Sequence, residues 1–238
     1  MIGAHYALVI GLAISGQTHS DAGAISGIVV NASQGGVPAA HAEVVLRVQV
    51  DGQFVPAAET VADAQGRFHF PDLPADAGFV YLPGANRDDV HYPGKRLRLT
   101  AARPEVDVKL KVCDSIAHPC PLVIKRQDIL IRPEPGALHV TESLLVSNPT
   151  RTTYVGQAKK EAAEPVTLQL SIPSDFDRTT FHKEFFGRRF SIAGGKLVTG
   201  VPWTPGEQEL KFTYTLRNEE KYRLWQRPLD LPCDNVRL

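Results

Sequence analysis

The sequence predicts an all-β protein made of two β-sandwich domains. Segments 43–50, 106–112, 166–172 and 209–216 alternate between apolar and polar residues, as strands do when one face is buried and the other is solvated. Glycine and proline lie mostly between such segments, where turns are expected. Apolar residues at helical spacing are scarce, so the pattern favours sandwiches over units that alternate strand and helix.

The length of 238 residues suits two small sandwiches. We expect a signal peptide over residues 1–24, a first sandwich over 25–112, a linker over 113–121 and a second sandwich over 122–238. The linker is placed where the alternation pauses in a segment that contains cysteine and proline.

The N-terminal region predicts export. Residues 7–15 form an apolar run that is too short to span a bilayer but suits the central part of a signal peptide. Residues 22–24 then offer a cleavage motif of small residues. The first six residues contain no lysine or arginine, so an N-terminal strand or a misassigned start codon stays open. We expect an extracytoplasmic mature chain, periplasmic or secreted, without a transmembrane span; an uncleaved signal would anchor it.

The charge balance argues against nucleic-acid binding. Lysine and arginine together number 26, as do aspartate and glutamate, so the formal net charge is zero. Binding to phosphate backbones depends on an excess of basic residues. A nucleic acid is therefore not an expected partner.

The stretch TVADAQGRFHFPDLP, residues 60–74, predicts the corner of a β-sheet rather than a reactive site. Asp63 to Gly66 fit a type I turn, in which the Asp63 carboxylate accepts from the backbone N–H two residues on. After the turn, Phe68 and Phe70 are expected to face the core, because alternate residues of a strand share a face.

This stretch is part of a longer pattern that resembles the carboxypeptidase regulatory-like domain, a transthyretin-like β-sandwich. The pattern runs from Ala24 to about Val112 and consists of Ser26-Gly27-Ile28-Val29, the turn Gly36-Val37-Pro38, Ala42 and Val44, then Thr60, Asp63, Gly66, Phe68, Phe70 and Leu73. The resemblance implies a structural module, since the equivalent module of carboxypeptidases sits beside the catalytic domain and carries no catalytic residues.

The second half, from roughly Leu122, is similar to a β-sandwich that follows such domains in uncharacterised exported bacterial proteins. The segments that carry this similarity are LHVTESLLVSNPT, TLQLSIP, VPWTPGEQELKFTY and LDLPCDNV. Related sandwich folds also occur among carbohydrate-binding modules, so a glycan stays open as a ligand by analogy of fold.

One group of candidate ligand-binding residues lies in the segment NRDDVHYPG and comprises Arg87, Asp88, Asp89, His91 and Tyr92. Carboxylates beside an imidazole are a donor set for a divalent cation. A solvated loop after the turn Pro83-Gly84 is the commoner structure for such a segment.

Trp203 and Trp225 are further candidates. An exposed tryptophan at the rim of a sandwich can stack on a sugar ring, whereas core packing is the commoner fate of the residue. Glu142 falls among alternating apolar residues, so we expect it to face inward and to form structural hydrogen bonds rather than to act in catalysis.

Three cysteines are present. Cys113 and Cys120 bracket a short loop, and a disulfide between them is compatible with export. Free thiols and a metal site that includes His118 stay open as alternatives. Cys233 is left over near the C-terminus.

The sequence contains none of the motifs HExxH, GxSxG, P-loop or GxGxxG. We therefore assign no catalytic residue, metal or cofactor. The expected function is that of a non-catalytic exported binding or interaction module of the bacterial cell envelope, with an envelope protein or a glycan as partner. Two alternatives are a carbohydrate-binding module that uses exposed aromatic residues and a metal-dependent hydrolase centred on Asp88, Asp89 and His91.

Overall fold

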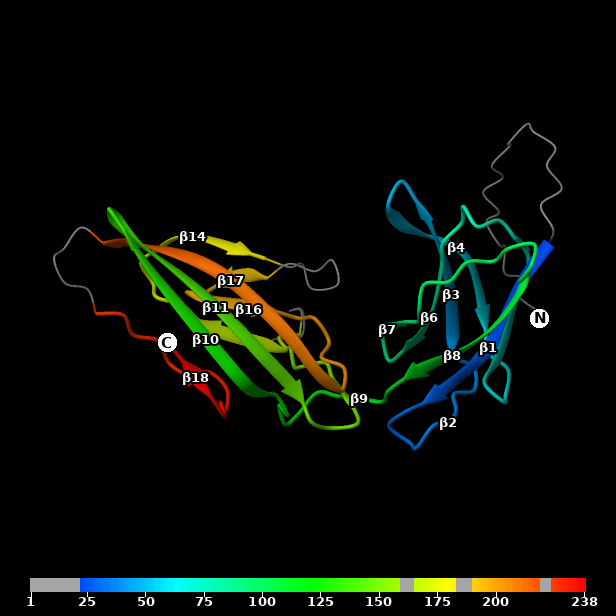
Figure 1. Ribbon diagram of the computed structural model, residues 1–238. Helices are drawn as coiled ribbons and strands as arrows, with labels where there is room; N and C mark the ends of the chain where they lie inside the picture. Colours follow the sequence, from blue (N-terminus) through cyan, green and yellow to red (C-terminus); the bar gives the residue numbers. More distant parts are fainter. Residues whose placement is uncertain (1–21, 159–164, 183–189, 219–223) are drawn as a thin grey trace. The chain divides into compact units, whose positions relative to one another are not determined.

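The computed structural model describes residues 22–158, 165–182, 190–218 and 224–238 (Figure 1). The chain divides into two compact units, Met1–Asp114 and Ser115–Leu238. This division falls inside the segment that the sequence predicts to be a linker.

The first unit contains two sheets. Its strands are β1 (Ala22–Asn31), β2 (Val37–Pro38), β3 (Glu43–Val50), β4 (Gln53–Val61), β5 (Arg67–Pro74), β6 (Tyr81–Arg87), β7 (Val90–Pro93) and β8 (Glu105–Val112). One sheet has the order β2-β1-β5, with β8 also paired to β1, and the other has the order β4-β3-β6-β7. β1 runs parallel to β8 and antiparallel to β5.

Alternation along the strands decides which residues form the core of this unit. In β3, Val44 and Leu46 are buried, and Ala85 and Tyr92 continue the buried face on β6 and β7. Residues one position away, such as Glu43, lie on the outer face of the same sheet. The predicted fold class, all-β with sandwich domains, is confirmed.

The first strand begins before the expected domain boundary. β1 starts at Ala22 rather than at Ile25, and Gly23 pairs with Leu73 of β5. A side chain at Gly23 would place its Cβ 2.6 Å from the Pro104 carbonyl oxygen, so the close approach of the two segments requires glycine. The remainder of the predicted signal peptide lies outside the described residues.

The predicted corner at residues 60–74 is confirmed. The Asp63 carboxylate accepts from the backbone N–H groups of Gln65 at 2.9 Å and Arg67 at 2.8 Å. Phe68 and Phe70 are buried on β5, with ring centroids 5.9 Å apart.

The second unit contains one large sheet and smaller ones. Its strands are β9 (Ser115–Ile116), β10 (Val123–Glu134), β11 (Gly136–Asn148), β12 (Thr153–Tyr154), β13 (Leu168–Ser171), β14 (Phe176–Phe181), β15 (Ser191–Ala193), β16 (Lys196–Thr199), β17 (Gly206–Asn218) and β18 (Val236–Arg237). The large sheet has the order β14-β17-β11-β10-β18, and the others are β13-β16-β15 and β12-β9.

The long strands β10, β11 and β17 supply most of the core of this unit. Val140, Leu144 and Phe212 from the large sheet pack in one cluster with Leu170 and Leu197 from β13 and β16. Trp203 lies in the same cluster. The second unit is therefore held by apolar residues from sheets on both sides of its core.

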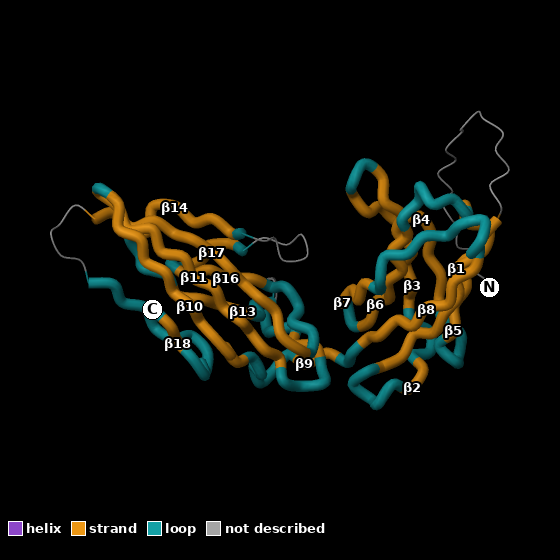
Figure 2. The backbone as a smooth tube through the Cα atoms, viewed as in Figure 1, coloured by secondary structure: helices purple, strands orange, loops and turns teal. Residues whose placement is uncertain are grey.

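Strands and loops account for all of the chain that the structure describes, and none of it is helical (Figure 2). Consequently no helix in these described ranges is of a length and apolarity that could cross a membrane.

Candidate functional site

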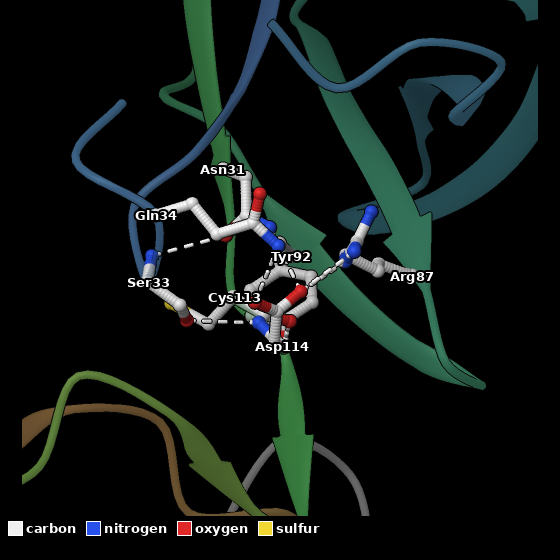
Figure 3. Close-up of polar contacts among 7 residues, drawn as sticks. All are labelled: Asn31, Ser33, Gln34, Arg87, Tyr92, Cys113 and Asp114. Atoms are coloured by element: carbon white, nitrogen blue, oxygen red, sulfur yellow. Dashed lines mark hydrogen bonds and ion pairs between the residues drawn. The ribbon is translucent and has the colours of Figure 1, made fainter. Parts of the chain in front are cut away.

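Three segments of the first unit meet at the side chain of Asp114 (Figure 3). Its Oδ1 accepts from Arg87 Nη2 at 2.6 Å, from Arg87 Nε at 3.0 Å and from Asn31 Nδ2 at 2.8 Å. Its Oδ2 accepts from Gln34 Nε2 at 3.0 Å. One carboxylate thus joins the end of β8 to the loop after β1 and to the β6–β7 hairpin. We call these four residues the Asp114 cluster.

Backbone groups complete the arrangement. The Asp114 N–H donates to Ser33 Oγ at 2.9 Å, and the Ser33 N–H donates to Asn31 Oδ1 at 3.0 Å. Tyr92 donates its hydroxyl to the Cys113 carbonyl at 3.0 Å, next to the cluster. The loop after β1 and the end of β8 therefore hold each other in place.

The electrostatics of Asp114 follow from these donors. Partial burial alone would raise the pKa of Asp114, but hydrogen bonds from Asn31, Gln34 and Arg87, together with the Arg87 charge, lower it below its ordinary value. Asp114 is therefore an anionic anchor and not a proton donor at neutral pH.

The tip of the β6–β7 hairpin is a two-residue turn. Arg87 pairs with Val90, and the two residues between them have positive φ angles, 49° at Asp88 and 60° at Asp89. This is the conformation of a type I′ turn, which aspartate tolerates better than most residues. Both aspartates are exposed, while Arg87 beside them is fixed to the Asp114 cluster.

His91 and these aspartates are not grouped as the metal-binding alternative requires. Its Nδ1 is bonded to Asn86 Oδ1 at 2.7 Å and its Nε2 to Arg47 Nη1 at 2.5 Å. Burial, followed by the Arg47 charge, lowers its pKa to about 4. A cation bound to Nε2 would have to displace the Arg47 guanidinium from the ring. In the described ranges no three or more histidine, cysteine, aspartate or glutamate side chains are grouped to hold a metal.

Two of the three aromatic candidates, Trp203 and Tyr92, are buried. Trp203 is 1% exposed and Tyr92 is 7% exposed, so neither presents a ring face to solvent. Trp225 packs partly buried against the core of the second unit and donates its Nε1 hydrogen to Tyr214 at 3.0 Å. These residues satisfy the core-packing alternative, because large apolar rings gain most from burial.

The expected Cys113–Cys120 disulfide is not formed. All three cysteines are thiols, with Cys113 buried and Cys120 exposed. Cys113 follows β8 and belongs to the first unit, whereas Cys120 belongs to the second unit. Burial, and then the hydrogen bond and charge of Cys120, raise the pKa of Tyr154 to about 12.

Glu142 faces inward, as expected, and is fully buried. Gln127 Nε2 donates to its Oε2 at 2.8 Å and Tyr214 donates to its Oε1 at 2.9 Å. Arg227 Nε lies 2.8 Å from Oε1, and the Arg227 side chain is 2% exposed. Burial raises the pKa of Glu142, against the opposing effects of Arg227, Tyr214 and Gln127. The partners of Glu142 in its predicted structural role are thus side chains.

Arg227 and Asp230 extend this buried group to the C-terminal segment. Arg227 Nη1 lies 3.8 Å from Asp230 Oδ2, and Asp230 accepts from the Ser171 hydroxyl at 2.6 Å and from its backbone N–H at 2.8 Å. The C-terminal segment is consequently fixed to β11 and β13 through charges.

Sequence reasoning missed Asp114 and Arg227, the two residues on which these groups depend. Both lie outside the alternating segments, and their partners are distant in sequence. The inward position of Glu142 was a usable signal, since a buried carboxylate requires a partner.

No family model and no curated protein matches this chain. Among solved structures, a 9R-lipoxygenase from Cyanothece PCC8801 is 15% identical, with 42% of this chain and 17% of that chain covered and a TM-score of 0.27. The Corynebacterium diphtheriae major pilin SpaA is 10% identical, with 82% and 58% covered and a TM-score of 0.31. This chain spans less than two thirds of either protein. TM-scores this low support no functional inference.

Removing the Asp114 charge should destabilise the first unit. In Asp114→Asn the new amide N–H groups face the donors of Gln34 or Arg87. We therefore expect the free energy of unfolding of the first unit to fall by about 1 to 2 kcal/mol. Hydrogen exchange of β1 and β8 measures the change. Asp107→Asn, at an exposed position of β8, is the control, and equal exchange in both variants would refute the anchoring role.

Burial, and then the Arg47 charge, should keep His91 neutral in the folded protein down to a pH of about 4. The unfolded chain takes up this proton near the ordinary value of 6.5, so stability is lost as the pH falls from 6.5 towards 4. NMR titration of the His91 ring measures the folded pKa directly. Arg47→Met should move the midpoint upward; a midpoint near 6.5 in the unaltered protein would contradict this account.

The two halves of the Glu142–Arg227 pair should respond unequally to removal. Glu142→Gln leaves a buried guanidinium that cannot lose its charge. We expect this to lower the free energy of unfolding by about 3 to 5 kcal/mol. Arg227→Met should cost less, because Glu142 can take up a proton instead. Urea unfolding followed by tryptophan fluorescence reports this, since both tryptophans lie in the second unit. Equal costs would argue against a charged pair.

Proposed function

We propose that this protein is an exported, non-catalytic interaction module of the bacterial cell envelope. In this proposal the first unit is a carboxypeptidase regulatory-like sandwich that contacts an envelope protein through the β6–β7 turn. The observation that carries the proposal is the exposed pair Asp88 and Asp89, held on a hairpin whose base is tied through Arg87 to Asp114.

A turn fixed in this way suits recognition. Association costs less when the contacting loop is already ordered, because little conformational freedom remains to be lost. Two adjacent carboxylates favour a partner with a basic surface, and charge complementarity of this kind acts on the rate of encounter and on specificity. Binding should therefore weaken as salt is raised.

Support for a non-catalytic role comes from the engagement of the titratable candidates. His91 is bonded at both ring nitrogens, and Glu142 is fully buried among three partners. Both side chains are committed to holding the fold. The burial of Trp203 and Tyr92 favours a protein partner over a glycan bound by stacking.

Cross-linking of the full chain in a bacterial envelope extract tests this function. The double variant Asp88→Asn/Asp89→Asn removes both charges while keeping residues that accept positive φ. We expect it to lose the cross-linked protein that the unaltered chain captures, and raised salt to have the same effect.

Asp72→Asn is the matched control. Asp72 is likewise exposed and has a φ of 54°, but it lies on β5 away from the hairpin. It should capture the partner normally. If the double variant captures the same proteins as the unaltered chain, the β6–β7 turn is not the contact surface.

A further inference from the structure

The outer face of the large sheet in the second unit carries an ordered pattern of charges. On β17, β11 and β10 the outward positions alternate with buried residues such as Phe212, Val140 and Ile129. Across the sheet they form rows, in the order β17, β11, β10: Glu209–Leu145–Arg126, Lys211–Ser143–Asp128, Thr213–Thr141–Leu130, Thr215–His139–Arg132 and Arg217–Ala137–Glu134.

These rows are complementary to themselves. Consider a two-fold axis that lies in the contact plane, along the Thr213–Thr141–Leu130 row and perpendicular to the strands. This axis places a second copy face to face with the first, so that each strand lies antiparallel on the same strand of the second copy. The first row then meets the last, and the second row meets the fourth. Glu209 faces Arg217 of the second copy, and Arg126 faces Glu134 of the second copy. Asp128 similarly faces Arg132 of the second copy, so no like charges are opposed.

The apolar centre of the face obeys the same symmetry. Leu130 is 49% exposed and lies on β10 beside Thr141 of β11, beyond the part of β10 that β18 pairs with. The axis passes through its row, so Leu130 packs on Leu130 of the second copy. Burying a leucine that is half exposed in the single chain adds a hydrophobic gain at the middle of the contact.

The positions of a surface hollow and of the His139 side chain favour this axis over a two-fold axis that runs parallel to the strands. The hollow, about 240 Å³, is lined among others by Arg126, Asp128, Ser143 and Lys211. Under the proposed axis, Ser143 meets His139 of the second copy, so the imidazole enters the hollow. An axis along the strands would instead set hollow against hollow and His139 against His139.

His139 is held ready for this position. Its Nδ1 lies 3.2 Å from Thr215 Oγ1 and its Nε2 lies 3.1 Å from Glu134 Oε2. Its ring is thereby fixed before association, which lowers the ordering cost. We propose that the second unit associates through this face with a second copy of the chain, in an antiparallel two-fold dimer. This goes beyond the proposed function, which concerns the first unit.

Sedimentation equilibrium of the full chain tests the proposal. We expect a reversible dimer, with the dissociation constant raised about tenfold or more by Leu130→Asp, which sets two carboxylates together at the axis. Glu209→Arg should also weaken the dimer, because it opposes Arg217. The double variant Glu209→Arg/Arg217→Glu restores opposite charges and should recover most of the affinity.

Leu229→Asp is the matched control, since Leu229 is an exposed leucine of the same unit, at 55%, outside this face. It should leave the dimer intact, and at a protein concentration low enough for every variant to be monomeric, tryptophan fluorescence should give all variants the same unfolding midpoint. A monomeric unaltered chain, or a dimer that Leu130→Asp does not weaken, would overturn the proposal. Weakening by Glu209→Arg without recovery in the double variant would refute the antiparallel arrangement.

Discussion

The Asp114 carboxylate is the constraint on which the β6–β7 end of the first unit depends. Three segments leave their strands there, and each would be a loop of independent conformation without a shared acceptor. A carboxylate can accept several hydrogen bonds at once, and its charge strengthens each of them. The exposed turn beside it is therefore ordered by a contact at its base, and both aspartates of the turn are exposed.

The second unit uses the opposite arrangement. Asp114 is partly solvated, so water shares the stabilisation of its charge, whereas Glu142 and Arg227 are both shut away from solvent. A buried pair contributes little net stability but is costly to break. Its physical effect is to fix one arrangement, because the C-terminal segment cannot leave β11 without exposing apolar core or stranding a charge.

Local regularities of the sequence predicted much of the fold, and distant partners could not be predicted. Alternation placed β3, β8 and β17, and the turn chemistry of Asp63 placed the corner before β5. The inward position of Glu142 followed from the same alternation. The contact between Arg227 and Glu142 could not be predicted in this way, because no periodicity of the sequence connects the two residues. The burial of Trp203 likewise depends on how strands from different parts of the chain pack.

Open sheet edges are the usual route by which β proteins associate, and here prolines interrupt several of them. β4 and β5 end their sheet orders and contain Pro56 and Pro71, while Pro133 lies on β10 beyond the part that β18 covers. Proline lacks the N–H that a new strand would bond. Where a proline interrupts an edge, contacts through side chains rather than through backbone groups are therefore expected. Both surfaces proposed above, a turn tip and a sheet face, meet that condition, and their charges decide which partners they admit.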